Sequence, residues 1–282
     1  LKPTLGYTFG SQRDIRHLAA RNGWLTVFPE FNQQYTETQS KQLDLSANIE
    51  PVRDLKIDIV GNRLYSENLT ESFNTTDTNG DGFSDTYNSL IQNTFGNFSI
   101  STALIKTAFG KSDVNSSDAF NDFRDNRLVI ARRVAQENGV NLGNPANFEN
   151  NDITGFPKGY GKTSQAVLLP SFLSAYTGQG ADKVKLGAFR DIPIPNWDIK
   201  YTGFMKFNWF KNKFKRFSVT HGYRASYTIN QFRTNLDYTR PDFNFDYDVQ
   251  PQDVLDQSGN YKNETLFSNI NLTEIFSPLI RI

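Results

Sequence analysis

Residues 199–230 read IKYTGFMKFNWFKNKFKRFSVTHGYRASYTIN. Apolar and polar side chains alternate in two arms, Ile199 to Trp209 and Phe217 to Ile229, which a short basic turn around Lys211–Lys213 joins. Alternation with a period of two predicts a β-hairpin with one apolar and one polar face. Both arms exceed the usual strand length of about five or six residues and reach the length of about nine to eleven that a tilted strand needs to cross a bilayer.

A second hairpin is predicted nearer the N-terminus. Leu43 to Glu50 alternates in the same way, the turn Pro51–Asp54 follows, and Leu55 to Ile59 alternates again. Further candidate strands are Phe98 to Phe109, Phe232 to Tyr238 and Leu266 to Phe276. These patterns predict an all-β, antiparallel chain.

Two stretches rich in Asn, Asp, Ser and Gly, residues 68–97 and 110–196, are expected to be long loop insertions between the strands. The second contains a predicted helix at Asp118 to Gln136, where apolar side chains recur at spacings of three and four. A short helix is predicted within Gly10 to Gly23. Such loops are uncommon in compact domains, whereas membrane barrels carry long loops at one end.

Composition narrows the class of protein. The 30 Lys and Arg balance the 30 Asp and Glu, so net charge gives no general attraction to nucleic acid or anionic lipid. There is no cysteine, which excludes disulfides and thiolate sites. Unbroken apolar runs reach only four residues, too short for a transmembrane helix. A secreted β-rich domain and a barrel wall both fit, because a barrel strand needs only alternating side chains.

Residues 77–85 resemble the first nine positions of a calcium-binding loop. The candidate ligands are Asp77, Asn79, Asp81 and Asp85 through their side chains and Phe83 through its carbonyl oxygen. Gly82 occupies the sixth position, where the loop turns sharply, but Asn88 replaces the usual glutamate at the twelfth. The segment is therefore either a weak structural calcium site or a solvated turn. No other cofactor is expected.

A cluster of basic and aromatic residues surrounds the turn of the first hairpin. It comprises Lys206, Lys211, Lys213, Lys215 and Arg216 interleaved with Phe207, Trp209, Phe210, Phe214 and Phe217. Such a cluster could stack the bases of a single-stranded nucleic acid, or it could form an aromatic girdle at a membrane interface. The girdle also explains the strand lengths, so no nucleic-acid partner is expected.

Nothing in the sequence predicts an enzyme. The two histidines, His17 and His221, fall in a helix and in the middle of a strand. Gly159 to Thr163 ends like a phosphate-binding loop, but the glycine spacing is wrong and no hydrophobic strand precedes it. The acidic run Asp242 to Asp256 is interpreted as a solvated loop.

Several separated phrases of the sequence resemble those of one family in the same order. They are Leu5–Tyr7 with residues 10–16 and 22–26, Phe120 with residues 123–127, residues 167–178, residues 194–203 and residues 276–280. These phrases are similar to the SprA/Sov family, the outer-membrane translocon of the type 9 secretion system. The resemblance covers nearly the whole chain.

The resemblance implies that residues 1–282 are part of a single larger transmembrane β-barrel of about 36 strands, with a few short helices and with long loops at the cell surface. The first residue, Leu1, and the patterned C-terminus also suggest a segment of a larger protein. The implied function is export of folded proteins through the bacterial outer membrane. The implied partners are cargo with a C-terminal sorting domain, including gliding-motility adhesins, a lipid-binding outer-membrane barrel, a periplasmic plug protein and membrane lipid.

Two alternatives stay open, a secreted calcium-binding β-sandwich adhesin and an unrelated porin or receptor barrel. In the barrel interpretation, alternation assigns side chains to the two faces of the wall. The Ile199 to Trp209 series, Tyr223, Ala225 and Tyr227 are expected to face lipid, and Lys200, Lys206, Arg224 and Asn230 are expected to face the lumen.

Overall fold

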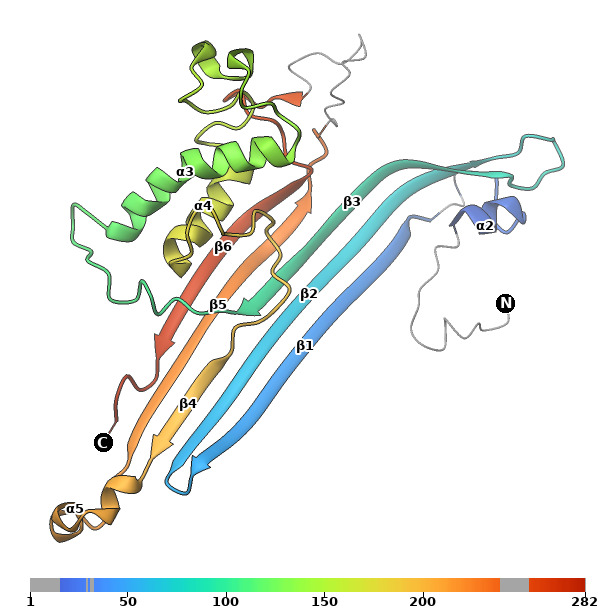
Figure 1. The fold of residues 1–282 in the computed structure, drawn as a ribbon. Coiled ribbons are helices and arrows are strands. Elements are labelled where there is room, and N and C mark those ends of the chain that lie inside the picture. The colour runs from blue at the N-terminus through green and yellow to red at the C-terminus, as the bar shows by residue number, and fades with distance from the viewer. Residues whose placement is uncertain (1–15, 29, 31–32, 239–253, 282) are drawn as a thin grey trace. The chain divides into compact units, whose positions relative to one another are not determined.

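The computed structural model describes residues 16–28, 30, 33–238 and 254–281. Six strands are present: β1 (Tyr35–Val52), β2 (Leu55–Thr76), β3 (Thr86–Ser101), β4 (Asn196–Tyr201), β5 (Val219–Thr234) and β6 (Thr265–Phe276) (Figure 1). The α-helices are α2 (Arg16–Arg21), α3 (Asp118–Glu137), α4 (Gln165–Thr177) and α5 (Asn208–Lys213). Short 3-10 turns occur at Pro145–Asn147, Glu149–Asn151 and Gly203–Lys206. Among these described residues, no helix is long and apolar enough to cross a membrane.

The strands form one six-stranded sheet in the order β1, β2, β3, β5, with β6 on the other side of β5. β4 pairs with both β2 and β5, and its pairing with each is antiparallel. The predicted mainly β, antiparallel fold is confirmed. The predicted hairpin nearer the N-terminus is present as β1–β2. The other predicted hairpin is present in part, because β4 and β5 pair antiparallel but residues 202–218 connect them in place of a short turn.

β3 and β4 together fill one strand position between β2 and β5 (Figure 1). The chain leaves the sheet after Ser101 and re-enters at Asn196. The Ile194 amide donates to the Ser101 carbonyl at 3.0 Å, and the Ala225 amide donates to Asn196 Oδ1 at 2.7 Å. Residues 102–195, here called the helical insertion, therefore interrupt a single strand.

The helical insertion packs α3 and α4 against one face of the sheet. Ser117 caps the N-terminus of α3, because its hydroxyl accepts from the Phe120 amide, and a left-handed Gly139 with φ of 80° follows the end of the helix. The shared core joins α3 (Ile130, Ala131, Val134, Ala135), α4 (Val167, Leu169, Leu173) and the sheet (Phe98, Ile100, Tyr227, Ile229, Phe232). The predicted helix over Asp118 to Gln136 is confirmed, but residues 110–196 are a packed helical layer rather than a loop.

Two sequence expectations about strand limits are wrong. β2 continues to Thr76 and β3 begins at Thr86, so only residues 77–85 of the expected loop 68–97 connect strands. These strand residues are mainly Asn, Ser, Thr, Glu and Gln, and their few apolar side chains do not alternate regularly. The strand expected over Ile199 to Trp209 ends at Tyr201, because the chain turns at Gly203 against the Tyr201 ring and then forms α5.

The chain divides into two compact units, Leu1–Gln39 with Glu67–Phe95, and Ser40–Ser66 with Gly96–Ile282. In the first unit, α2 packs on the β2–β3 hairpin. Arg16 pairs with the fully buried Glu71, to which Gln92 also donates at 2.9 Å. The Tyr87 ring stacks on Phe73 and meets His17 edge to face. His17 thus has a packing role.

Candidate functional site

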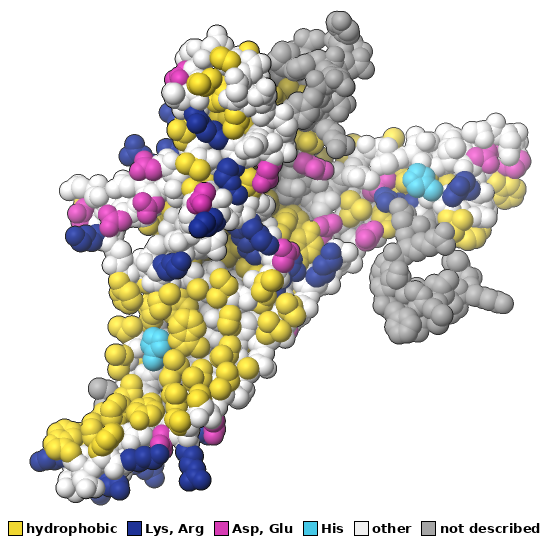
Figure 2. Space-filling view, in the orientation of Figure 1, with side chains coloured by type: hydrophobic (Ala, Val, Ile, Leu, Met, Phe, Trp, Pro, Cys, Tyr) yellow, Lys and Arg dark blue, Asp and Glu magenta, His cyan; other side chains and the backbone are white. Residues whose placement is uncertain are grey.

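One face of the second unit is apolar across three strands. The register places Leu55, Tyr201 and Val219 in one row, Ile57, Ile199 and His221 in the next, and Ile59, Trp197 and Tyr223 in a third. Paired residues in neighbouring strands point to the same face. The rows therefore form a continuous apolar surface, which is visible over the lower part of the sheet in Figure 2.

β1 extends this surface. Glu50 pairs with Lys56 at 2.9 Å, and Asn48 donates to Asp58 at 3.0 Å, so the even-numbered residues of β1 and β2 share the opposite face. The odd-numbered residues of β1 then lie beside Ile57 and Ile59. We call the combined surface the apolar belt: Leu43, Leu45, Ala47, Ile49, Leu55, Ile57, Ile59, Trp197, Ile199, Tyr201 and Val219.

The face behind the apolar belt is polar. Its rows run Lys56, Lys200, Thr220 and Asp58, Asp198, Gly222. Arg224 Nη2 lies 2.8 Å from Asp198 Oδ2, an ion pair between neighbouring strands. Val60 is an apolar exception on this face, with 52% of its surface exposed. The sheet thus separates an apolar from a charged side.

The apolar belt has a measurable height. On β2 it starts just after the turn at Asp54 and ends before Arg63. Residues 55 to 62 are seven steps of about 3.3 Å, so they span ~23 Å of strand, or ~18 Å along a membrane normal at a tilt of about 40°. Outer-membrane barrels carry an apolar band about 25 Å tall. The belt therefore covers most of the height that a barrel strand presents to lipid.

Aromatic rings and cations mark the lower end of the apolar belt. Phe210 contacts Phe204, Phe214 and Phe217 at ring-centroid distances of 5.2, 6.1 and 4.7 Å, and Trp209 packs beside it at 4.9 Å. Lys206 pairs with Asp54, whose hydrogen bond raises the pKa of the lysine. Lys211 and Lys213 lie in the last turn of α5. Figure 2 shows Lys and Arg side chains at the lower end of the hydrophobic surface.

The structure corrects part of the expected assignment of faces. Ile199 lies on the apolar face, and Lys200 and Arg224 share the polar face, as predicted. Tyr223 points to the apolar side but is fully buried in a cluster with Leu104, so the expectation that it faces lipid is wrong. Tyr227 is 1% exposed beneath the helical insertion and donates to the Ala188 carbonyl at 3.1 Å, so it does not form part of the open surface.

Two further expectations about faces change as well. Ala225 is 3% exposed and packs in a cluster with Leu104 and Tyr223, so it does not face an open surface. Lys206 lies in a 3-10 turn outside the strands. Asn230 is exposed and lies six residues beyond Arg224 on β5, so it shares the polar face with Arg224, as predicted. Sequence alternation could not reveal these differences, because they depend on where the insertion folds back.

The calcium-like loop connects β2 to β3 in the first unit. Asp77 accepts from the amides of Asn79, Gly80 and Gly82 at 3.2, 2.6 and 2.7 Å. Asp85 accepts from the Thr78 amide at 2.8 Å and from its hydroxyl at 2.6 Å. The Gly82 amide is the main cause that lowers the pKa of Asp77, and the Thr78 hydroxyl is the main cause for Asp85.

The remaining candidate ligands also cap backbone amides. Asn79 Oδ1 accepts from the Asp81 amide at 2.9 Å, and Asp81 Oδ1 accepts from the Phe83 amide at 2.9 Å. Within the residues that the structure describes, no group of three or more His, Cys, Asp or Glu side chains is placed to hold a metal ion. Calcium at this loop stays a prediction.

His221 lies in the apolar face and its partner is a backbone group. Its Nδ1 donates to the Leu279 carbonyl at 2.6 Å, and its ring lies 6.4 Å from that of Trp197. The acidic residues up to Asp253 lie outside the described residues. Asp256 is described and accepts from the Ser258 and Asn260 amides. The expectation of no catalytic activity stays a prediction.

Comparisons with family models and with curated proteins found no match. No family model matches the chain. No curated protein matches it significantly. The functional argument therefore rests on the apolar belt, the polar face behind it and the phrases in the sequence.

Proposed function

We propose that this chain forms part of the wall of a large outer-membrane β-barrel that exports folded proteins. The observation that carries the wall is the apolar belt, an exposed apolar face whose opposite face is charged. A lipid-facing side and a water-filled lumen require this asymmetry.

The export function rests on the resemblance to the SprA/Sov translocon. The proposed partners are cargo proteins with a C-terminal sorting domain, a lipid-binding barrel, a periplasmic plug and outer-membrane lipid. The helical insertion would then lie among the loops at the cell surface.

A soluble calcium-binding adhesin is the weaker alternative, because it would leave the apolar belt in contact with water. Monomeric soluble proteins rarely expose contiguous apolar patches beyond a few hundred Å². An unrelated porin or receptor barrel would have the same belt. Only the sequence resemblance favours the translocon over it.

The wall can be tested by placing the same charge on each face. Ile199→Arg puts a cation in the apolar belt and should destabilise the inserted protein by about 2–4 kcal/mol if it lies near the midplane. The control is Thr220→Arg, on the polar face of the adjacent strand, which should insert normally. Denaturant unfolding of the full-length protein in bilayers measures both. Equal stability of the two variants would contradict the proposed orientation.

The export step needs a separate test in cells. Deleting the gene for the full-length protein should leave cargo with a sorting domain inside the cell, and the wild-type gene should restore its secretion. A protein that fractionates with the outer membrane but leaves cargo secretion unchanged on deletion would support the porin or receptor alternative.

A further inference from the structure

A cleft of about 450 Å³ lies where the helical insertion meets the sheet. Its floor and one wall are apolar and are formed by Ile100, Leu173, Tyr227, Ile192 and Ile194. The two isoleucines of the returning segment are 80% and 42% exposed, so the apolar wall is open on one side. The cleft can therefore accept a hydrocarbon chain from the surface.

The lining of this cleft is also cationic. It presents Lys183, Lys185 and Arg190 with one carboxylate, Asp191. Lys185 Nζ lies 3.0 Å from Asp191 Oδ2. Three cations against one carboxylate leave two positive charges in excess. Arg190 is held in place by its own bond, Nη1 to the Lys185 carbonyl, at 3.0 Å.

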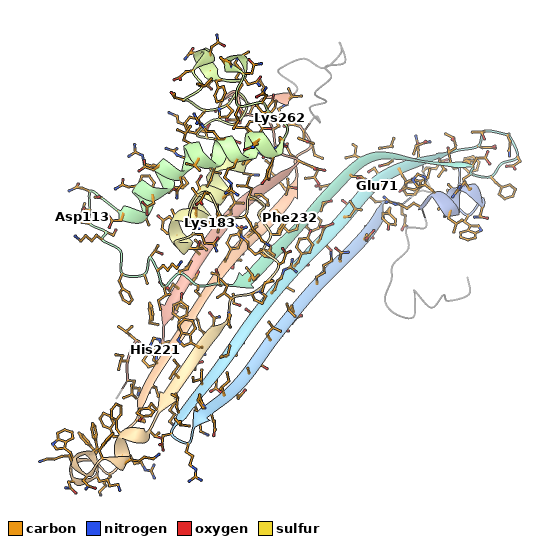
Figure 3. All side chains as sticks on the ribbon, viewed as in Figure 1. Glu71, Asp113, Lys183, His221, Phe232 and Lys262 are labelled. Carbon is orange, nitrogen blue, oxygen red and sulfur yellow. The ribbon has the colours of Figure 1, made fainter. Side chains whose placement is uncertain are left out.

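The cleft lies at the upper end of the apolar belt. Arg63, at the end of the belt on β2, donates from Nε to the Arg190 carbonyl at 2.7 Å. Pro193 packs over Gly61 of β2, where a Cβ atom would lie 3.6 Å from the proline ring. The returning segment therefore runs directly over β2. Figure 3 shows Lys183 near α4 and His221 farther down the sheet. The cationic lining is therefore at the height where a bilayer would carry its head groups.

We propose that this cleft binds an anionic membrane lipid, with the phosphate of its head group between Lys183, Lys185 and Arg190 and an acyl chain along Ile192 and Ile194. The inference rests on the proposed function, because the cleft meets lipid only if the apolar belt is embedded. Charge complementarity identifies the occupant: an excess of cations beside an open apolar wall fits a molecule with an anion at one end and a hydrocarbon chain at the other.

The test uses the full-length protein in lipid nanodiscs that contain equal amounts of phosphatidylglycerol and phosphatidylcholine with identical acyl chains. Native mass spectrometry then counts which lipid stays bound after release from the disc. We expect the anionic lipid to be retained preferentially. The double variant Lys183→Gln with Lys185→Gln should lose that preference by about 25-fold, since each interfacial lysine contributes about fivefold.

Two controls isolate the cleft. Lys111→Gln with Lys162→Gln removes the same charge from exposed positions of the insertion outside the cleft lining and should leave the preference unchanged. Lys183→Arg with Lys185→Arg keeps the charge and should keep the preference. A parallel sample with inorganic phosphate tests whether a free anion suffices.

The outcomes separate this inference from the proposed function. If the protein inserts into nanodiscs but Lys183→Gln with Lys185→Gln behaves like Lys111→Gln with Lys162→Gln, the proposed lipid site is wrong. The proposed barrel wall is unaffected by that result. If inorganic phosphate displaces the lipid at equal concentration, the site takes a free anion and the lipid assignment is wrong. If the protein stays soluble and never inserts, the proposed function fails and the lipid site fails with it.

Discussion

The Asp77 carboxylate organises the loop between β2 and β3, because it accepts three backbone amides of its own turn. Replacing it by alanine leaves the Gly80 and Gly82 amides without their acceptor. We expect these amides in Asp77→Ala to exchange with deuterium several-fold faster. Asp81→Ala is the matched control, because Asp81 caps only the Phe83 amide. Faster exchange at Gly80 and Gly82 in both variants alike would contradict this role.

The same carboxylates predict how the loop responds to acid. The pKa values of Asp77 and Asp85 are lowered in the folded protein, so the loop gains stability above the ordinary aspartate pKa of about 3.9. This contribution is lost as pH falls through the lower, folded pKa values. Deuterium exchange of residues 77–85, corrected for intrinsic rates, should therefore stay slow at neutral pH and rise only in the strongly acidic range. A rise near neutral pH would contradict this prediction.

Single residues also show how far alternation predicts a face. It assigns Ile199 and Lys200 correctly, because both lie where the sheet has no covering layer. It fails for Tyr227 and Ala225, which continue the same pattern and yet are buried. The difference comes from contacts distant in sequence, such as the Ala188 carbonyl that accepts from Tyr227. A pattern within one strand contains no information about such contacts.

At the scale of elements, α3 connects the helical insertion to the sheet. Ile130 is fully buried in the shared core, and the adjacent Val129 is 44% exposed. Ile130→Ala should destabilise the insertion by about 2–5 kcal/mol through lost burial and a residual cavity. Val129→Ala should change stability by about 0.5 kcal/mol or less. Thermal unfolding of the helical circular-dichroism signal compares the two, and equal shifts would show that this face of α3 is not the packed one.

The helices and strands differ in how well they could be predicted from the sequence. α3 has one apolar face, and its limits could be predicted closely. α4 could not, because its apolar residues surround the helix and Pro170 stands inside it. A helix buried on most sides loses the periodic pattern on which prediction depends. The upper parts of β2 and β3 were missed for the opposite reason, since Asn, Ser and Thr occupy both of their faces.

In the whole molecule, the sheet has open edges, and these edges determine whether the isolated chain associates with other copies. Within the described part of the chain, β1 pairs with β2 alone and β6 with β5 alone. Long unpaired edges are templates for further strands. We therefore expect the isolated 282-residue chain to self-associate in detergent, as measured by light scattering after size exclusion. A monodisperse monomer in buffer without detergent would contradict both this expectation and the barrel wall.

The interrupted strand has a consequence for how such a chain can change through evolution. The insertion departs and returns at neighbouring points, which the Ser101 to Ile194 hydrogen bond fixes. Lengthening a connection between fixed ends costs little, about 0.6 kcal/mol for each doubling of a flexible loop. Residues can therefore be gained or lost in the loops of the insertion, between Ser101 and Asn196, without shifting the register of a neighbouring strand. The surface that the insertion presents can diversify while the sheet beneath it keeps its pattern.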